Sequence, residues 1–229
     1  MRGLYRRTKE TKDMKTTLHK TTRGTGIIMF LLMTLFASPI SAQGAAEVWL
    51  NKAIGRLRDK GVEIVFRINE EGMRTSGKLL INEQKFAYDT EEMKIWYDGT
   101  TQWTLQQGGG YNELYISNPT IEDQQSINPY LLLNNYKKSF TIADGGEKSH
   151  NGKMTHLVIL SAGDGSKDFK GVNVYIYSDG TLAALELEAT NGYIYEIEIR
   201  SMRNGLTFPK ETFTYSKKEY PADEVIDMR

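Results

Sequence analysis

Hydrophobic residues recur at two different periods along this chain, and the change of period separates one long helix from a series of strands. Between residues 45 and 60 the apolar positions follow helical spacing, which predicts a helix with one apolar face. Lys60-Gly61 predicts its end, because glycine is favoured just beyond a helix C-terminus. Strict alternation from Val62 to Asn69 then predicts a half-buried strand. The apolar helix positions are Ala46, Leu50, Ala53, Ile54 and Leu57.

Residues 77–118 contain a series of short runs with strand character joined by tight turns, and the rest of the chain is organised around them. Asp98-Gly99 and Gly108-Gly110 separate the later runs, and Asp-Gly between apolar-patterned runs is a strong hairpin signal. The first runs place apolar side chains on one parity, and therefore on one face. The segment predicts an antiparallel meander with an aromatic-rich face. The residues of that parity are Leu79, Ile81, Phe86 and Tyr88.

A break after the meander is followed by a short apolar helical segment. Thr120–Asp123 has the pattern of a capped helical turn. Asn128 is expected to be the N-cap of the next helix and Pro129 its first residue, where the missing N–H costs nothing. The residues that follow, 130–133, form an apolar plug that ends at Asn134.

The second half of the chain returns to strands. We expect strands over 140–142, 154–161, 172–177, 182–189 and 193–200, with turns at 144–146, 179–180 and 191–192. About ten short strands predict a mainly β (α+β) fold, an incomplete antiparallel β-barrel or strongly curved sheet. The N-terminal helix and the short helical segment would cover one side as a lid over an apolar cavity.

The first 42 residues have the organisation of a signal peptide. A basic leader precedes the apolar run Gly26–Phe36, and small residues follow, which predicts cleavage near Ala42. Met14 is an alternative start to Met1, and an uncleaved N-terminal anchor is the alternative interpretation of the apolar run. Residues 43–229 are expected to form one exported domain.

Removing the leader changes the charge of the chain. The whole sequence has 29 basic and 29 acidic residues. The leader holds eight of the basic and two of the acidic residues, so 21 basic and 27 acidic residues remain. A net charge near −6 argues against nucleic acid as a partner, because binding to nucleic acid depends on neutralising phosphates. The chain has no cysteine, so disulfides play no part in its stability.

Candidate catalytic and metal-binding patterns are sparse. His150 in a loop and His156 in a strand have no metal-ligand spacing, and no G-x-S-x-G elbow is present. The segment Asp164–Asp168 resembles a calcium loop but lacks its ligand periodicity. Carboxylates two apart, Glu186 with Glu188 and Glu196 with Glu198, leave open an exported esterase or glycosidase, although such pairs are usually a solvated strand face.

The large apolar residues allow two interpretations. They are either ordinary core or, in part, the walls and lid of a cavity for acyl chains, which needs no catalytic group. Burial of a methylene contributes about 0.8 kcal/mol, so a long acyl chain gains much from such a cavity. These residues are Trp49, Phe66, Phe86, Tyr88, Trp96, Trp103 and the segment 130–133.

The order of the motifs resembles the periplasmic carriers of outer-membrane lipoproteins, the LolA family. The resemblance covers nearly the whole chain after residue 42, with moderately specific order and spacing. It rests on the helix 48–57, Gly77–Ile81, Phe86-Ala87-Tyr88, Asp98–Trp103, Asn128–Leu132, Val174–Leu182, Phe213–Tyr215 and Val225–Asp227.

This resemblance implies a periplasmic, monomeric chaperone without a cofactor or enzymatic activity. Such a carrier takes acylated lipoproteins or lipids from a releasing inner-membrane transporter and passes them to an outer-membrane receptor. The positions that it implies for the cavity and its lid are Ile54, Phe66, Leu79, Ile81, Phe86, Tyr88, Trp103, Tyr130, Leu131 and Leu132.

One segment departs from the family pattern. Well-studied members have an Arg-Pro pair after the strand that matches Gly77–Ile81, and this Arg latches the lid, whereas here the chain has Asn82-Glu83-Gln84. The latch is absent or differently made. The alternative function is therefore a periplasmic lipid-binding or sensor protein of an envelope complex, without lipoprotein transfer.

Overall fold

The structure is a computed structural model that describes residues 42–70, 72–125, 127–163 and 169–229. Residues 1–41 of the predicted leader and the loop Asp164–Asp168 lie outside these residues, and Ala42, the last residue of the predicted leader, is described. The helix α1 (Ala42–Arg58) comes first, and the expected apolar stripe on it is confirmed as buried. A helix found over almost the predicted range places the first strand immediately after Gly61.

Six strands follow α1 as an antiparallel meander, as the alternation and the Gly-containing turns predict. They are β1 (Val62–Glu70), β2 (Met73–Asn82), β3 (Lys85–Thr90), β4 (Met93–Tyr97), β5 (Gln102–Gly108) and β6 (Tyr111–Ser117). The helical segment contains α2 (Ile121–Gln124), α3 (Pro129–Asn134) and the short 3-10 helix η1 (Tyr136–Lys138). The second set of strands is β7 (Phe140–His150), β8 (Lys153–Ala162), β9 (Phe169–Ile176), β10 (Leu182–Ala189) and β11 (Ile194–Arg203). The chain ends with η2 (Lys210–Phe213) and β12 (Glu224–Asp227).

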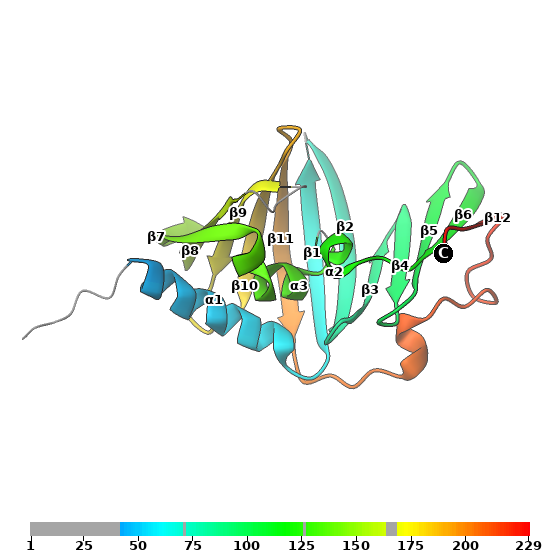
Figure 1. The fold of residues 1–229 in the computed structure, drawn as a ribbon, viewed down its shortest axis with the longest axis horizontal. Helices are drawn as coiled ribbons and strands as arrows, with labels where there is room; N and C mark the ends of the chain where they lie inside the picture. Colours follow the sequence, from blue (N-terminus) through cyan, green and yellow to red (C-terminus); the bar gives the residue numbers. More distant parts are fainter. Residues whose placement is uncertain (1–41, 71, 126, 164–168) are drawn as a thin grey trace, which may run out of the picture. The chain divides into compact units, whose positions relative to one another are not determined.

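The described strands form a single sheet of twelve, in the order β12-β6-β5-β4-β3-β2-β1-β11-β10-β9-β8-β7. The two meanders meet where β1 pairs with β11, so that residues far apart in sequence are neighbours at the centre of the sheet. The sheet curves but does not close, and β12 and β7 form its two edges (Figure 1). The predicted mainly β fold with an incomplete barrel is therefore confirmed.

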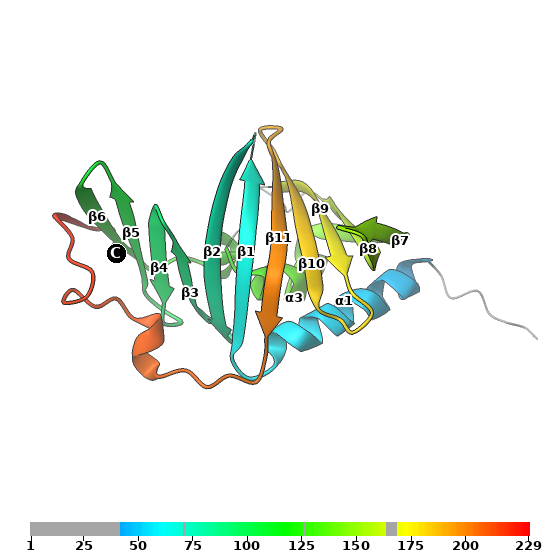
Figure 2. The same cartoon turned by 180° about the vertical axis from the view of Figure 1, so that it is seen from behind.

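The helices lie on one face of this sheet, which we call the inner face. In Figure 1, α1 and α3 lie in front of the strands, and in Figure 2 the opposite, outer face of β1, β11 and β10 is turned to the viewer. The main core forms between the buried stripe of α1, the apolar side of α3 and the inward side chains of β1–β4 and β8–β11. The turn after β9 also contacts α1, since Arg56 Nε donates to the Asp179 carbonyl at 3.0 Å.

Gly77 allows a large ring to lie flat over the inner face. Gly77 is the cross-strand partner of Phe66, and a Cβ at residue 77 would lie 2.5 Å from Phe66 Cζ and 2.7 Å from the Asp89 carbonyl oxygen. Only glycine leaves that space free. The Phe66 ring therefore reaches across β2 and stacks on Tyr88, with 5.4 Å between the ring centroids.

A second, smaller core lies on the outer face at β4–β6. The buried residues Trp96, Leu105 and Leu114 are covered by Tyr215 and Tyr220 from the segment 204–223, which we call the C-terminal strap. The strap ends in β12, which pairs in parallel with β6. Neither the parallel pairing nor the strap was expected from the sequence pattern.

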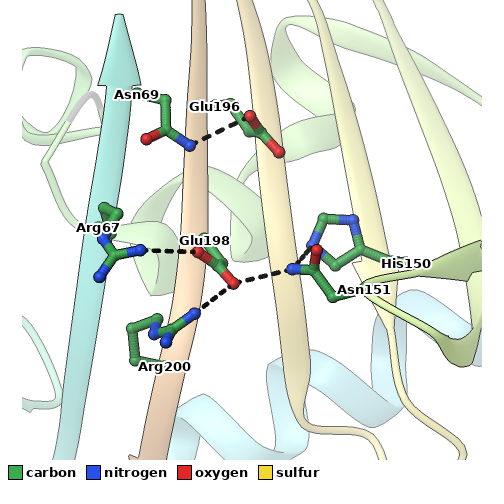
Figure 3. A network of polar contacts seen from close by, with 7 residues as sticks. All are labelled: Arg67, Asn69, His150, Asn151, Glu196, Glu198 and Arg200. Carbon is green, nitrogen blue, oxygen red and sulfur yellow. Dashed lines mark hydrogen bonds and ion pairs between the residues drawn. The ribbon is translucent and has the colours of Figure 1, made fainter. Parts of the chain in front are cut away.

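The remaining outer face holds a polar network across β1 and β11 (Figure 3). Glu198 accepts hydrogen bonds from Arg200 Nη1 at 2.6 Å and from Asn151 Nδ2 at 2.8 Å, and Arg67 Nη1 lies 3.9 Å away. Asn151 belongs to the β7–β8 turn. This turn therefore crosses the outer face of the neighbouring strands to reach β11.

Two expectations about the second half are wrong in detail. The turn predicted at 144–146 is a β-bulge within β7, where the register shifts between Asp144 and Gly146. The strand continues to His150, which the sequence pattern placed in a loop, and the turn itself is Asn151-Gly152. A glycine pair inside a strand marks a bulge as readily as a turn.

Candidate functional site

A cavity of about 210 Å³ lies on the inner face, between the middle of the sheet and the helical segment. Its lining is almost wholly apolar, and Tyr88 and Gln125 are the lining residues with polar side chains. Burial raises the pKa of the Tyr88 phenol, so this group stays neutral at ordinary pH. The lining residues are Ile64, Phe66, Ile68, Leu79, Tyr88, Met93, Ile95, Gln125, Ile127, Pro129, Leu132, Leu185, Leu187, Ile197 and Ile199.

The floor of the cavity comes from both halves of the sheet. β1–β4 supply one set of inward side chains, and β10 and β11 supply the other. The β1–β11 pairing joins the two sets, since Phe66 lies opposite Ile199 and Ile68 opposite Ile197. The floor therefore exists only where the two meanders meet.

The roof of the cavity consists of Gln125 and the segment from Ile127 to Leu132, and the cap of α3 fixes its path. Asn128 is the N-cap of α3, and its side chain accepts a hydrogen bond from the Tyr130 N–H at 3.0 Å. Pro129 occupies the first turn and also lines the cavity. Both of these sequence expectations are confirmed. Asn128 is fully buried, so α3 begins inside the protein.

Side-chain contacts attach this roof at two points. Before it, Gln124 on α2 is 1% exposed and its Nε2 donates to Gln102 Oε1 on β5 at 2.9 Å. After it, Arg58 Nη2 on α1 donates to Asn134 Oδ1 on α3 at 3.0 Å. At the place of the family latch, Asn82 ends β2, and Glu83 and Gln84 form the turn to β3, with Glu83 at φ 59°.

Four of the predicted cavity residues are brought together in the lining. Phe66, Leu79 and Tyr88 lie in the floor, and Leu132 lies in the roof. Ile81 and Phe86 are buried in the same core at 1% and 0% exposure, but they do not line the cavity.

The other four predicted residues lie elsewhere. Ile54 on α1 is buried and lines a separate groove beside α3. Tyr130 is partly buried against the main core, and Leu131 is 4% exposed, yet neither lines the cavity. Trp103 packs with Trp96 in the outer core, so its predicted place in the cavity wall is wrong.

Sequence reasoning missed the part of the lining that comes from distant strands. Leu185 and Leu187 on β10 and Ile197 and Ile199 on β11 alternate with charged residues, which is a strand signal without any hint of a cavity. Met93 and Ile95 have the same parity as Tyr97, but Trp96 between them is also apolar and conceals the face.

The histidines and paired glutamates have structural partners. The His156 ring stacks on Trp49 with 4.6 Å between centroids, and its Nε2 lies 2.6 Å from Asp144 Oδ1. The Gly146 N–H holds the pKa of Asp144 below its usual range, and His156 adds to this effect.

The carboxylates considered for catalysis lie on the outer face, away from the cavity. Asn69 Nδ2 donates to Glu196 at 3.2 Å, and Asn173 Nδ2 donates to Glu186 at 3.0 Å (Figure 3 shows the former). Within the described ranges, no cluster of His, Cys, Asp and Glu side chains has a metal-binding arrangement. In the same ranges, no helix has the length and apolarity to cross a membrane.

An open, curved antiparallel sheet with helices over an apolar cavity defines a class of binding proteins with one covered inner face. The family model for the outer membrane lipoprotein carrier protein LolA matches residues 42–179. This match spans more than half of the chain, so the chain belongs to that family. The family consists of carrier and binding proteins rather than enzymes.

Individual relatives are distant. An outer-membrane lipoprotein carrier protein of Legionella pneumophila (strain Lens) is 23% identical over 198 residues, covering 82% of this chain and 94% of the relative. A crystal structure of an uncharacterized conserved protein from Thermus thermophilus has the same fold, with a TM-score of 0.54 and 12% identity, covering 80% and 99% of the two chains. A LolA superfamily protein from Nitrosomonas europaea aligns with a TM-score of 0.40 and 12% identity over 74% and 97%.

Proposed function

We propose that this protein is a periplasmic carrier that binds the acyl chains of lipoproteins in the inner-face cavity and ferries them from the inner to the outer membrane. The observation that carries the proposal is the apolar cavity itself, enclosed between the sheet and a short helical roof. Each buried methylene would contribute about 0.8 kcal/mol. No reacting group is required, and the protein is proposed to act without a cofactor and not as an enzyme.

Loading is proposed to displace the roof. Ligand pockets usually have volumes of about 300–1,000 Å³, and the cavity of about 210 Å³ is smaller than this. The floor strands are held by sheet hydrogen bonds, whereas the roof is held by α3 packing and by the two side-chain contacts from Gln124 and Asn134. The roof is therefore the part that moves to admit an acyl chain.

The cellular route is part of the proposal. Residues 1–42 are proposed to be a signal peptide and residues 43–229 the single exported domain, acting as a monomer. Its partners would be an inner-membrane transporter that releases lipoproteins and an outer-membrane receptor. Family membership and the carrier name of the Legionella relative support this route.

A fluorescent fatty-acid probe tests the cavity. We expect micromolar binding to residues 43–229, and we expect Ile68→Asp to weaken it by about tenfold or more, because a carboxylate in an apolar cavity is costly. Ile68 is half-buried in the lining, so the fold should survive the change. Ile194→Asp is the matched control, since Ile194 is 62% exposed on β11.

The outcomes separate the possible functions. Equal binding by both variants would place the probe outside the cavity and overturn the proposal. Probe binding without transfer of a lipoprotein to outer-membrane vesicles would favour the lipid-binding or sensor function instead. A Glu186→Gln, Glu196→Gln variant should bind the probe as the unchanged protein does, and chemical conversion of a lipid that this variant abolishes would indicate an enzyme.

A further inference from the structure

A second concave surface lies beside the helical roof, on the opposite side of α3 from the cavity. This groove of about 420 Å³ lies between α1 and the α3–η1 segment, and we call it the α1–α3 groove. It shares no lining residue with the cavity. α3 separates the two, since Leu132 lines the cavity whereas Asn134 lines the groove. The groove residues are Asn51, Ile54, Gly55, Arg58, Asn134, Asn135, Tyr136, Lys137 and Lys138.

The lining carries positive charge on a protein that is acidic after its leader. Arg58, Lys137 and Lys138 line the groove, and no carboxylate is among its lining residues. One of these cations has an acidic contact from outside the lining, since Glu47 lies 3.3 Å from Lys137 Nζ. Such a local excess of cations attracts an anionic partner even where the net charge of the molecule is negative.

The other lining groups match a polypeptide. Asn51, Asn134 and Asn135 offer amides that can both donate to and accept from a peptide backbone. Ile54 and Tyr136, at 8% and 6% exposure, form an apolar floor for a side chain. A concave surface with this lining suits an extended segment better than the flat surface of a bilayer. We propose that the α1–α3 groove docks an acidic, partly apolar segment of a partner protein.

Docking at this groove would act on the roof of the cavity. The Arg58–Asn134 hydrogen bond spans the groove and joins α1 to the end of α3. A partner carboxylate would compete for Arg58, because a guanidinium–carboxylate pair, in which both groups are charged and two parallel N–H bonds can form, is stronger than a guanidinium bond to a neutral amide. Release of Asn134 would loosen α3, and Leu132 two residues earlier in α3 lines the cavity. This step rests on the proposed function, whereas docking itself does not.

A short fluorescein-labelled peptide in which glutamates alternate with leucines tests the docking. Fluorescence anisotropy with ligand-free protein should show salt-sensitive binding, and Arg58→Glu with Lys138→Glu should weaken it by about tenfold or more. Lys217→Glu with Lys218→Glu is the matched control, because both lysines are exposed on the C-terminal strap and the charge change is the same. The control should bind as the unchanged protein does.

Three results would overturn the docking proposal. The first is a loss of peptide binding in the control variant as large as that in the groove variant. The second is equally tight binding of a peptide that has lysines in place of the glutamates. The third is the absence of peptide binding by the unchanged, folded protein. The groove would instead be a membrane contact if the groove variant no longer co-sediments with phosphatidylglycerol vesicles but still binds the peptide. In that case the control variant would still co-sediment. Circular dichroism confirms that each variant is folded.

The coupling to the roof is measured separately. Saturating acidic peptide should accelerate the dissociation of a bound fluorescent fatty acid several-fold, and the Arg58→Gln variant, which loses the charge, should reduce this acceleration. An unchanged dissociation rate with the peptide bound would overturn the coupling. If the fatty acid does not bind at all, the proposed function fails, and the peptide titration still decides the docking on its own.

Discussion

Tyr175 shows how an outward-facing residue can be partly buried on the outer face of a sheet. It lies on β9, and the His150 ring from the β7–β8 hairpin lies 5.1 Å from its ring centroid. Ala184, its cross-strand partner and also the partner of Glu198, is fully buried. The small alanine leaves room for the hairpin turn to cross β10 and reach Glu198 through Asn151.

This burial makes stability sensitive to alkali. Burial, with a further contribution from Glu186, raises the pKa of Tyr175 to about 12 from 10.0. The unfolded chain loses the phenolic proton first as the pH rises, so stability falls between pH 10 and about 12. Tyr175→Phe should make the urea midpoint less dependent on pH across this range. Tyr177→Phe, at the position directly after the end of β9, is the control, and an identical pH slope for both variants would contradict the prediction.

Residue patterns predicted the face of a side chain only where one face of the strand is apolar. Phe66, Leu79 and Tyr88 lie on the inner face, as the shared parity of the large apolar residues in their strands predicts. In β4 and β5 the alternation of apolar and polar residues does not identify the inner face. Ile95, Trp96 and Tyr97 are consecutive and all buried, because the C-terminal strap covers the outer face of these strands. Trp103 follows Trp96 to that face through the β4–β5 register. The strap lies more than a hundred residues further along the chain, so the local sequence of β4 and β5 gives no sign that their outer face is buried.

At the scale of elements, the amide contact between α2 and β5 is expected to help hold the roof in place. Gln124 is 1% exposed, and its Nε2 has Gln102 Oε1 as an acceptor. Gln102→Ala would leave this buried donor without its acceptor, and such a loss costs about 1–3 kcal/mol. We expect a lower urea midpoint and faster exchange of a fatty-acid probe. Gln106→Ala, an exposed position on β5, is the control.

A particular result would count against this role of the contact. If the Gln102 variant loses stability but keeps the probe exchange rate of the unchanged protein, Gln124 stabilises the fold without controlling the roof. If neither property changes, water replaces the lost acceptor and the contact has no effect on either.

The elements themselves were largely predictable, while their long-range pairing was not. Helix α1, the cap at Asn128 and most strands follow from periodicity, glycine turns and capping preferences. The β1–β11 pairing and the parallel pairing of β12 with β6 depend on tertiary packing. The cavity floor depends on the first of these, so β10 and β11 could not be assigned to it from local pattern.

At the scale of the whole molecule, β12 protects the edge of the sheet. It pairs with β6 along four residues, and Met228 N donates to the Ile116 carbonyl at 2.8 Å just beyond it. Removal of residues 224–229 would leave the β6 edge unpaired, and an unpaired edge favours strand pairing with another copy. We expect concentration-dependent self-association in size-exclusion chromatography with light scattering.

The strap should remain bound in this truncated chain, because Tyr215 and Tyr220 pack on Trp96. Val225→Ser is the matched control, since Val225 is 53% exposed and the change leaves β12 in place. A truncated chain that stays monomeric at high concentration would show that the edge is protected in another way.

The pairing of β1 with β11 also has a consequence for how the protein reaches its native state. Each meander consists of neighbouring hairpins, which form rapidly, whereas the central pairing must bring together segments separated by most of the chain. During synthesis, β11 is made long after β1. One edge of β1 therefore stays unpaired at the centre of the future sheet until β11 has been made, and the cavity floor is complete only when these two strands pair.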